Sequence, residues 1–285
     1  MSENSKKQVA KEEKKSIAVF DNSILKKAGS SLSERGAEDY QIPYLSIIAS
    51  TSPQRKKNDS KYIEGAEEGK IFNNVTNKLY DEITVLPVYY RRRYVEWHSD
   101  RSKATSPINT YTIDQYEKLK REGKIVRGDD NKERIVGGDT YVENTAEHYV
   151  IVLEDDGSWN QAIIKMKSTQ LKKSRTWNSI MANQRRVDGD QIYQPKDFAR
   201  SYKLTTHSDG NDKGDWYGWV INQDKWIDEI DNPNLQKIFE DAIKFEKAIH
   251  KGDVSGVEDD FSVETSSPVN GEASKSGSSD EDLPF

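Results

Sequence analysis

The chain has 285 residues, of which 33% are apolar and 32% charged, so it can build a core but must leave long stretches outside it. It contains no cysteine, which excludes disulfide bonds and cysteine metal sites and is typical of a reducing cytoplasm. No apolar run is as long as a membrane span, and the Lys- and Glu-rich first twenty residues lack the apolar stretch of a signal peptide. We therefore expect a cytoplasmic protein without membrane contact.

The net charge of −6 conceals a strong sorting of charge along the chain. From Lys251 onward there are two basic and nine acidic residues, a net of −7, whereas the first 250 residues carry 41 basic and 40 acidic ones, a net of +1. Within that part, residues 161–203 hold ten Lys or Arg against three Asp, a net of +7. A locally basic body is thus followed by an acidic tail, and this pattern matters more than the isoelectric point.

The body is predicted to contain several strands, after a flexible arm of residues 1–38 that is rich in Lys, Glu and Ser. Each predicted strand is an aromatic or β-branched run bounded by turn residues. The strands are residues 40–48, residues 83–90 continuing toward Trp97, the hairpin 147–153 with 159–166, and a weaker hairpin around residues 128–131.

Three helices are predicted from apolar residues at helical spacing. They are residues 112–122, residues 168 to about 186, and residues 234–251. The last has the clearest amphipathic stripe and ends before Gly252, which suits the position after a helix end. Residues 251–279 are rich in Gly, Ser, Asp and Glu without periodicity, which predicts a disordered linker.

The last six residues, Asp280-Glu281-Asp282-Leu283-Pro284-Phe285, form a distinctive acidic tip. Three adjacent carboxylates attract Lys- and Arg-rich surfaces, and Pro284 restricts the backbone before Phe285, which carries both a ring and the α-carboxylate. A partner with an apolar pocket rimmed by Arg can hold both groups. Acidic tails are common, solubilising and disordered, but three acids followed by Leu or Ile, Pro and Phe at the chain end arise by chance on the order of once in a million.

This tip resembles the C-terminal tip of bacterial single-stranded DNA-binding proteins. The order of mobile arm, large body and acidic tail resembles in particular the single-stranded DNA-binding proteins of tailed phages, although no motif of the body carries the resemblance. It implies a protein that coats and protects single-stranded DNA during replication, recombination and repair, and a possible homo-oligomer. It also implies recruitment of a polymerase, helicase or primase, with Phe285 as anchor and the carboxylates of Asp280, Glu281 and Asp282 as steering group.

Short antiparallel strands with a few helices predict a mainly β (α+β) fold for residues 39–250. We expect an antiparallel β-barrel similar to the oligonucleotide-binding fold (OB-fold), a choice that also rests on the functional resemblance. A minimal five-stranded barrel would leave much of this body over, so the barrel must carry large insertions or a second subdomain.

Single-stranded DNA requires cations along its phosphates and flat side chains on which bases stack. Residues 89–98 interleave the two: on a strand, Tyr90, Arg92 and Tyr94 share one face, and Arg91 and Arg93 lie on the other. The alternative is that the aromatics are core and the arginines a solvated edge. The predicted contacts from this stretch are Tyr90, Arg91, Arg92, Arg93, Tyr94 and Trp97.

A second basic stretch runs from the predicted hairpin into the helix that follows it. Lys172 and Arg175 are neighbours on a helix, whose N-terminus also favours a phosphate. The alternative is a charged outer face with Trp177 packed inside, which we favour for Trp177 alone. The predicted contacts here are Lys165, Lys167, Lys172, Lys173, Arg175, Arg185 and Arg186. Weaker candidates are Arg55-Lys56-Lys57 and an aromatic group, residues 216–219 with Trp226, for which core packing is favoured.

No enzyme signature is complete, so we predict neither catalysis nor a cofactor or metal. Residues 65–70 are one residue short of a phosphate loop, and Ile71 stands where Ser or Thr would bind magnesium. The four histidines have no metal-site spacing, but a nuclease site assembled from distant carboxylates stays open. The rival hypothesis is a replisome adaptor, or a recombination mediator or annealing protein, that docks through the tail without itself coating single-stranded DNA.

Overall fold

The computed structural model describes residues 23, 27, 41–100, 106–211 and 214–252, and it divides the chain into two units, residues 1–40 and 41–285. Everything below concerns the second unit. The predicted arm apart from Ser23 and Lys27, the predicted linker beyond Gly252, and the tip of residues 280–285 lie outside the described residues.

The described part of the chain contains an 11-stranded sheet whose main path runs β13-β12-β4-β8-β9-β1-β2-β3. Its long strands are β4 (Ile83–His98), β8 (Thr140–Leu153), β9 (Trp159–Lys167), β12 (Arg200–Asn211) and β13 (Gly214–Trp226). Its short strands are β1 (Tyr44–Ile47), β2 (Ile71–Asn73), β3 (Leu79–Tyr80), β5 (Asn109–Tyr111), β6 (Ile125–Arg127) and β7 (Glu133–Ile135). A separate two-stranded hairpin consists of β10 (Arg186–Asp188) and β11 (Gln191–Tyr193).

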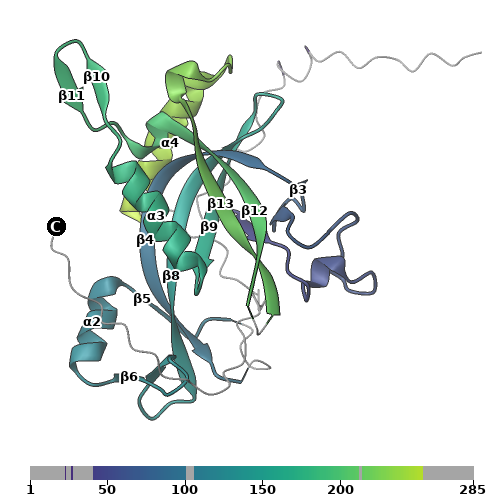
Figure 1. The fold of residues 1–285 in the computed structure, drawn as a ribbon, viewed down its shortest axis with the longest axis vertical. Coiled ribbons are helices and arrows are strands. Elements are labelled where there is room, and N and C mark those ends of the chain that lie inside the picture. Colours follow the sequence, from purple (N-terminus) through teal and green to yellow (C-terminus); the bar gives the residue numbers. More distant parts are fainter. Residues whose placement is uncertain (1–22, 24–26, 28–40, 101–105, 212–213, 253–285) are drawn as a thin grey trace, which may run out of the picture. The chain divides into compact units, whose positions relative to one another are not determined.

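Three α-helices accompany these strands in the described residues: α2 (Ile113–Arg121), α3 (Gln170–Ala182) and α4 (Leu235–Lys251). Single 3-10 turns occupy Pro53–Arg55, Asp197–Ala199 and Ile227–Glu229. The predicted mainly β, barrel-like α+β fold is confirmed. The sheet curls into a half-barrel (Figure 1). The half-barrel is open, because the described strands β13 and β3 at the two ends of the sheet do not pair with each other.

Both faces of the central sheet are buried, and α3 and α4 lie on opposite sides of it (Figure 1). Alternate residues of β8 enter different clusters: Val150 and Val152 pack in the cluster that includes Trp177 of α3, and Tyr149 and Ile151 in the cluster that includes Phe245 of α4. This double burial explains why the last five residues of β8, Tyr149 to Leu153, form a continuous apolar run and not an alternating one.

The helices begin and end for local reasons. Thr112 caps α2 through a capping box with Gln115, and α4 ends at Gly252, whose φ of +80° is left-handed and suits glycine. The predicted helix of residues 168–186 is wrong at its end, because α3 stops at Ala182 and Arg186 begins the β10–β11 hairpin. Strands of three residues with little burial carry no periodic signal that separates them from a frayed helix end.

The segment between β1 and β2 connects with the β12–β13 hairpin across the open side. Within this segment, the Ile48 amide donates to the Lys70 carbonyl at 2.8 Å. The hydroxyl of Thr206 in β12 donates to the Gly69 carbonyl, and the Tyr217 ring of β13 packs against Gly69. The half-barrel is thus joined across its gap by side-chain contacts in place of a strand ladder.

Candidate nucleic-acid interface

The three consecutive arginines of β4 alternate between the two faces of the sheet. Arg91 and Arg93 lie on the face that α4 covers, together with Lys165 and Lys167 of β9, which pair in register with Glu147 and Thr145 of β8. Arg92 lies on the other face, near the hydroxyl groups of Tyr90 and Tyr94. The predicted sharing of faces along β4 is therefore confirmed, and the first predicted stretch does not form one continuous surface.

Most cations on the α4 side are engaged with neighbours in the protein. Arg93 Nε lies 3.2 Å from the Glu147 carboxylate, and Lys167 Nζ lies 3.1 Å from that of Glu143. Lys165 Nζ lies 3.9 Å from the centre of the Tyr44 ring. Arg91 donates to the Ile249 carbonyl near the end of α4 at 3.4 Å and lies over the Tyr149 ring, so its position stabilises the C-terminus of that helix.

The aromatic side chains of the first stretch are also committed to packing. Tyr94 is buried and stacks on Tyr116 of α2, with ring centres 3.6 Å apart and an interplanar angle of 1°. Tyr90 is half-buried and lies 5.1 Å from the His148 ring. Trp97 is half-buried at the far end of β4, close to β5. The packing interpretation thus describes Tyr94 well, whereas Trp97 keeps an exposed part.

The cations of α3 are in a different situation. The helix contains no acidic residue, and among the residues that the structure describes Lys172, Lys173 and Arg175 form no ion pair. Lys172 and Arg175 are exposed and lie on neighbouring positions of the helix, whereas Trp177 is fully buried as the sequence indicates. This face of α3 therefore carries positive charge that the described protein does not neutralise.

The same helix face continues into an open groove of about 520 Å³. The groove lies between the C-terminal half of α3 and the ends of β12 and β13 that meet near Arg200. Its lining residues are mostly polar, with one aliphatic and one large aromatic side chain: Thr176, Ser179, Ile180, Asn183, Gln184, Arg185, Arg200, Gln223 and Trp226. Amides, hydroxyls, cations and a flat ring in one groove are the groups that bases and phosphates require.

Arginines surround the groove. Arg185 donates to the carbonyls of Ala182 and Gln184 at 2.8 and 2.7 Å, which orients its guanidinium, and no carboxylate of the described residues pairs with its charge. The guanidinium carbons of Arg186 and Arg200 each lie 4.8 Å from the centre of the Trp226 ring. Arg186 also binds the Asp228 carboxylate at 2.7 and 2.9 Å, and this contact lowers the pKa of Asp228. Two guanidinium groups thus lie close to the tryptophan ring at the groove wall.

The structure consequently divides the predicted contacts into two groups. The first group lies on α3, in the groove or at its edge, and consists of Lys172, Lys173, Arg175, Arg185 and Arg186. We call these residues, together with Arg200 and Trp226, the α3 groove surface. The β4 and β9 residues lie elsewhere. Arg200 was missed because it is a lone cation in sequence. Of the aromatic group, Trp219 is buried in the core as favoured, whereas Trp226 is only partly buried and lines the groove. The net charge of +7 over residues 161–203 was the signal that could have found Arg200.

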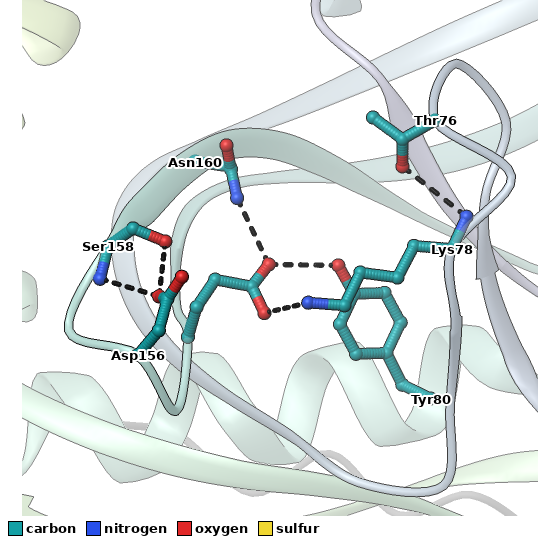
Figure 2. A network of polar contacts seen from close by, with 7 residues as sticks. Thr76, Lys78, Tyr80, Asp156, Ser158 and Asn160 are labelled. Atoms are coloured by element: carbon teal, nitrogen blue, oxygen red, sulfur yellow. Dashed lines mark hydrogen bonds and ion pairs between the residues drawn. The ribbon is translucent and has the colours of Figure 1, made fainter. Parts of the chain in front are cut away.

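A second hollow, of about 320 Å³, lies beside the β8–β9 turn. Figure 2 shows the polar network at its wall, in which the Glu154 carboxylate accepts from Lys78 Nζ at 2.6 Å, the Tyr80 hydroxyl at 3.0 Å and Asn160 Nδ2 at 3.0 Å. Burial and the bond to Glu154 raise the pKa of Tyr80 above its ordinary value. These groups satisfy one another, so the network holds the turn against β3 and leaves few polar groups for a ligand.

The remaining candidates are placed as follows. Arg55 donates to the Ser50 carbonyl and lies 3.5 Å from Glu68, whereas Lys56 and Lys57 are exposed. Among the residues that the structure describes, no three His, Asp or Glu side chains gather as a metal site. In the same residues, no helix is both long and apolar enough to cross a membrane.

Comparison with known protein families gives a match over most of the chain. The model of the family described as Pam3 phage gp34-like protein matches residues 12–255. No curated protein and no solved structure matches the chain.

Proposed function

The chain belongs to the Pam3 phage gp34-like protein family, and from this premise we propose that it binds single-stranded DNA along the α3 groove surface, without catalysis. The observation that carries the proposal is the absence of any carboxylate partner for Lys172, Lys173 and Arg175 among the described residues, on a helix that leads directly into a groove. By contrast, Arg93 is paired with the Glu147 carboxylate and Lys165 lies over the Tyr44 ring.

The groove supplies groups that can contact bases, which the face of α3 lacks. Binding of phosphates alone would not distinguish a single strand from a duplex, because both expose their backbones. Trp226, the planar guanidinium groups beside it, and the amides of Asn183, Gln184 and Gln223 can stack on and hydrogen-bond to unpaired bases. We therefore assign phosphates to the α3 face and bases to the groove.

The acidic tip contributes a second activity to the proposal. Residues 280–285 would dock a replication or recombination enzyme through the Phe285 ring and carboxylate, as the resemblance to single-stranded DNA-binding proteins implies. A phage protein with both parts would protect single strands in the host cell and bring the enzyme to them. Support for this part rests on the sequence of the tip alone.

Charge reversal on α3 tests the proposal. We expect Lys172→Glu with Arg175→Glu to weaken binding to an unstructured oligothymidine by about 30-fold or more, and to lower the salt slope of binding by about 1.4, because two phosphate contacts are lost. The matched control is Lys118→Glu with Arg121→Glu, which makes the same charge change at two exposed positions, also three apart, on α2. Fluorescence anisotropy with labelled oligonucleotides at several salt concentrations measures both quantities.

The outcomes separate the competing functions. Equal weakening by the α2 and α3 variants would show that only net charge matters, and would remove the case for the α3 groove surface. If the wild-type protein binds neither single nor double strands, the adaptor hypothesis replaces DNA binding. Magnesium-dependent cleavage of the oligonucleotide would instead reveal a nuclease.

A further inference from the structure

Arg92 carries a positive charge on the same side of the sheet as α3. It pairs across strands with Ala146 of β8, and residues paired in this way share a face. Ala146 belongs to the same core cluster as Trp177 of α3, which places Arg92 on the α3 side. Among the described residues Arg92 forms no ion pair, whereas Arg93, the next residue, binds Glu147 on the other side.

The surroundings of Arg92 explain why its charge is not paired. Its electrostatic neighbours are the hydroxyl groups of Tyr90 and Tyr94, on the same face of β4. Glu96 lies further along that face, but its carboxylate is engaged elsewhere. It accepts hydrogen bonds of 2.6 to 2.7 Å from three other side chains: Asn109, Tyr111 and Thr140. A partly buried cation flanked by neutral hydroxyl groups is stabilised by an anion.

The contacts of α3 give the order of sites along the sheet. Gln184, which follows α3 and lines the groove, donates to the hydroxyl of Tyr202, and Tyr202 pairs with Val85 of β4. Ser174, in the first half of α3, is hydrogen-bonded to His148 of β8 at 2.8 Å. The groove is therefore level with Val85, and the first half of α3 is level with His148.

Arg92 is the next site in this order. Tyr90 pairs with His148, the two rings are 5.1 Å apart, and Arg92 follows two residues later on the same face. Arg92 is thus about 23 Å from Val85 along β4, at the rise of a strand. Beyond Arg92, β4 and β8 continue toward α2 (Figure 1). The groove, the exposed cations of α3 around Ser174, and Arg92 succeed one another along one side of the sheet.

We propose that Arg92 binds a phosphate of the bound strand beyond those that α3 binds, so that the strand continues from the α3 groove surface onto β4. Of the three consecutive arginines, Arg92 alone makes this contact, because Arg91 and Arg93 lie on the other side of the sheet. This inference rests on the proposed function, since it extends the path of a strand that begins at α3.

Two physical arguments favour a phosphate of the strand as the partner of Arg92. A guanidinium presents parallel N–H donors that match the oxygens of a phosphate, and the buried Nε atom of Arg92 has no hydrogen-bond partner in the described chain. Cations that follow one another along one side of a protein suit a polyanion, whose charges recur along its length, better than a single anion.

The contact is tested by Arg92→Gln. We expect about tenfold weaker binding to oligothymidine and a salt slope lower by about 0.7, because one phosphate contact to a single strand is lost. The matched control is Arg91→Gln, which removes the same charge one residue away on the opposite face and should change the affinity by less than about twofold. Anisotropy titrations at several salt concentrations measure both quantities.

A second variant separates loss of the contact from loss of structure. Arg92→Lys keeps the charge but not the planar fork, so we expect about threefold weaker binding with the salt slope of the wild type. Circular dichroism checks that both Arg92 variants fold. A lysine variant that loses as much salt slope as the glutamine variant would contradict a phosphate contact at this position.

The length of the oligonucleotide tests the path of the strand. In a series of oligothymidines of about 4 to 16 nucleotides, the penalty of Lys172→Glu with Arg175→Glu should begin at shorter lengths than that of Arg92→Gln. The reason is that a strand seated in the groove reaches α3 before it reaches β4. Penalties that begin at the same length would contradict the order of the sites.

Failure of this inference is distinct from failure of the proposed function. If Arg92→Gln binds like the wild type while Lys172→Glu with Arg175→Glu loses affinity, the Arg92 proposal is overturned and DNA binding by α3 stands. If Arg92→Gln binds DNA more tightly than the wild type, Arg92 holds a competing anion such as the chain's own acidic tip, and the proposal is equally overturned.

Discussion

At the scale of single residues, the partners of a side chain decide its role more than its type does. Arg93 and Arg175 have the same chemistry, but Arg93 lies 3.2 Å from the Glu147 carboxylate and Arg175 extends from a helix without acidic residues. Attraction to a phosphate is strongest where no carboxylate of the protein competes for the cation. The described ion pairs therefore show which candidate cations are available to bind a phosphate, and residue type alone does not.

His148 makes the stability of the protein depend on pH. It is fully buried between the Tyr90 and Trp177 rings, accepts or donates a 2.8 Å hydrogen bond with Ser174, and burial lowers its pKa to about 3. In the unfolded chain its pKa is about 6.5. Its contribution to stability is therefore complete above about pH 6.5 and is lost as the pH falls toward 3, because only the unfolded chain takes up the proton.

We expect His148→Phe to flatten this dependence. A phenyl ring can keep the stacking on Trp177, so the free energy of unfolding should fall less steeply between pH 6.5 and 4, by up to about 1.4 kcal/mol per pH unit. Urea titrations at several pH values measure it. The exposed His207 of β12 provides the control His207→Phe, and identical slopes in all three proteins would contradict the assignment.

At the scale of elements, the half-barrel depends on a contact at Gly69 that joins its open side. The backbone there has φ of +87°, and a Cβ atom would lie 2.4 Å from the Tyr217 ring. An alanine therefore meets two penalties, the left-handed backbone and a clash with an aromatic ring. The sheet edge at β13 would lose its attachment to the segment before β2.

We expect Gly69→Ala to lower the free energy of unfolding by about 2 kcal/mol or more. Gly123→Ala is the matched control, because Gly123 has a φ of +69° with no atom within 4 Å of an added Cβ, so only the backbone cost of about 1 kcal/mol applies. In a Tyr217→Ala background the effect of Gly69→Ala should shrink to that of the control. Denaturant unfolding of the four variants completes the cycle, and additive effects would exclude the contact.

At the scale of the whole molecule, a basic surface and an acidic tail in one chain can bind each other. A coil of the predicted linker, residues 251–279, spans roughly 30 Å, which is enough for the tip to approach the chain's own cations. Under the proposed function, we expect the tip to compete with DNA while the α3 groove surface is empty and to become accessible to an enzyme once DNA is bound. This arrangement follows from charge and reach alone.

We expect deletion of residues 280–285 to tighten binding to single strands, most at low salt, and to abolish recruitment of the docking enzyme. Anisotropy titrations of the shortened and full-length proteins at several salt concentrations measure the first effect. A control that replaces Phe285 by Ala keeps the carboxylates, so it should bind DNA as the full-length protein does while losing the enzyme. Equal affinities of the full-length and shortened proteins at every salt concentration would contradict competition.

Much of the fold was predictable from local pattern, and the candidate site was predictable only in part. The strands of residues 83–98 and 147–166 follow from aromatic and β-branched runs bounded by turn residues, and the stripe of α4 follows from apolar residues that recur about every 3.6 positions. The exposed cations of α3 were also found in sequence. The pairing of Arg93 with Glu147 and the stacking of Tyr94 on Tyr116 join residues 54 and 22 positions apart, so no local pattern reports them.

The sequence by itself determined the mainly β character, the three described helices and the sorting of charge between body and tail. It did so because these properties depend on composition and on spacing between near neighbours. Only the tertiary structure decided which cations stay unpaired, that Arg200 and Trp226 meet the end of α3 in one groove, and that the β10–β11 hairpin extends from its wall. The curled sheet brings segments that are distant in sequence together and so determines which side chains are neighbours. A cation can bind an anionic ligand only where no carboxylate lies beside it in the folded protein.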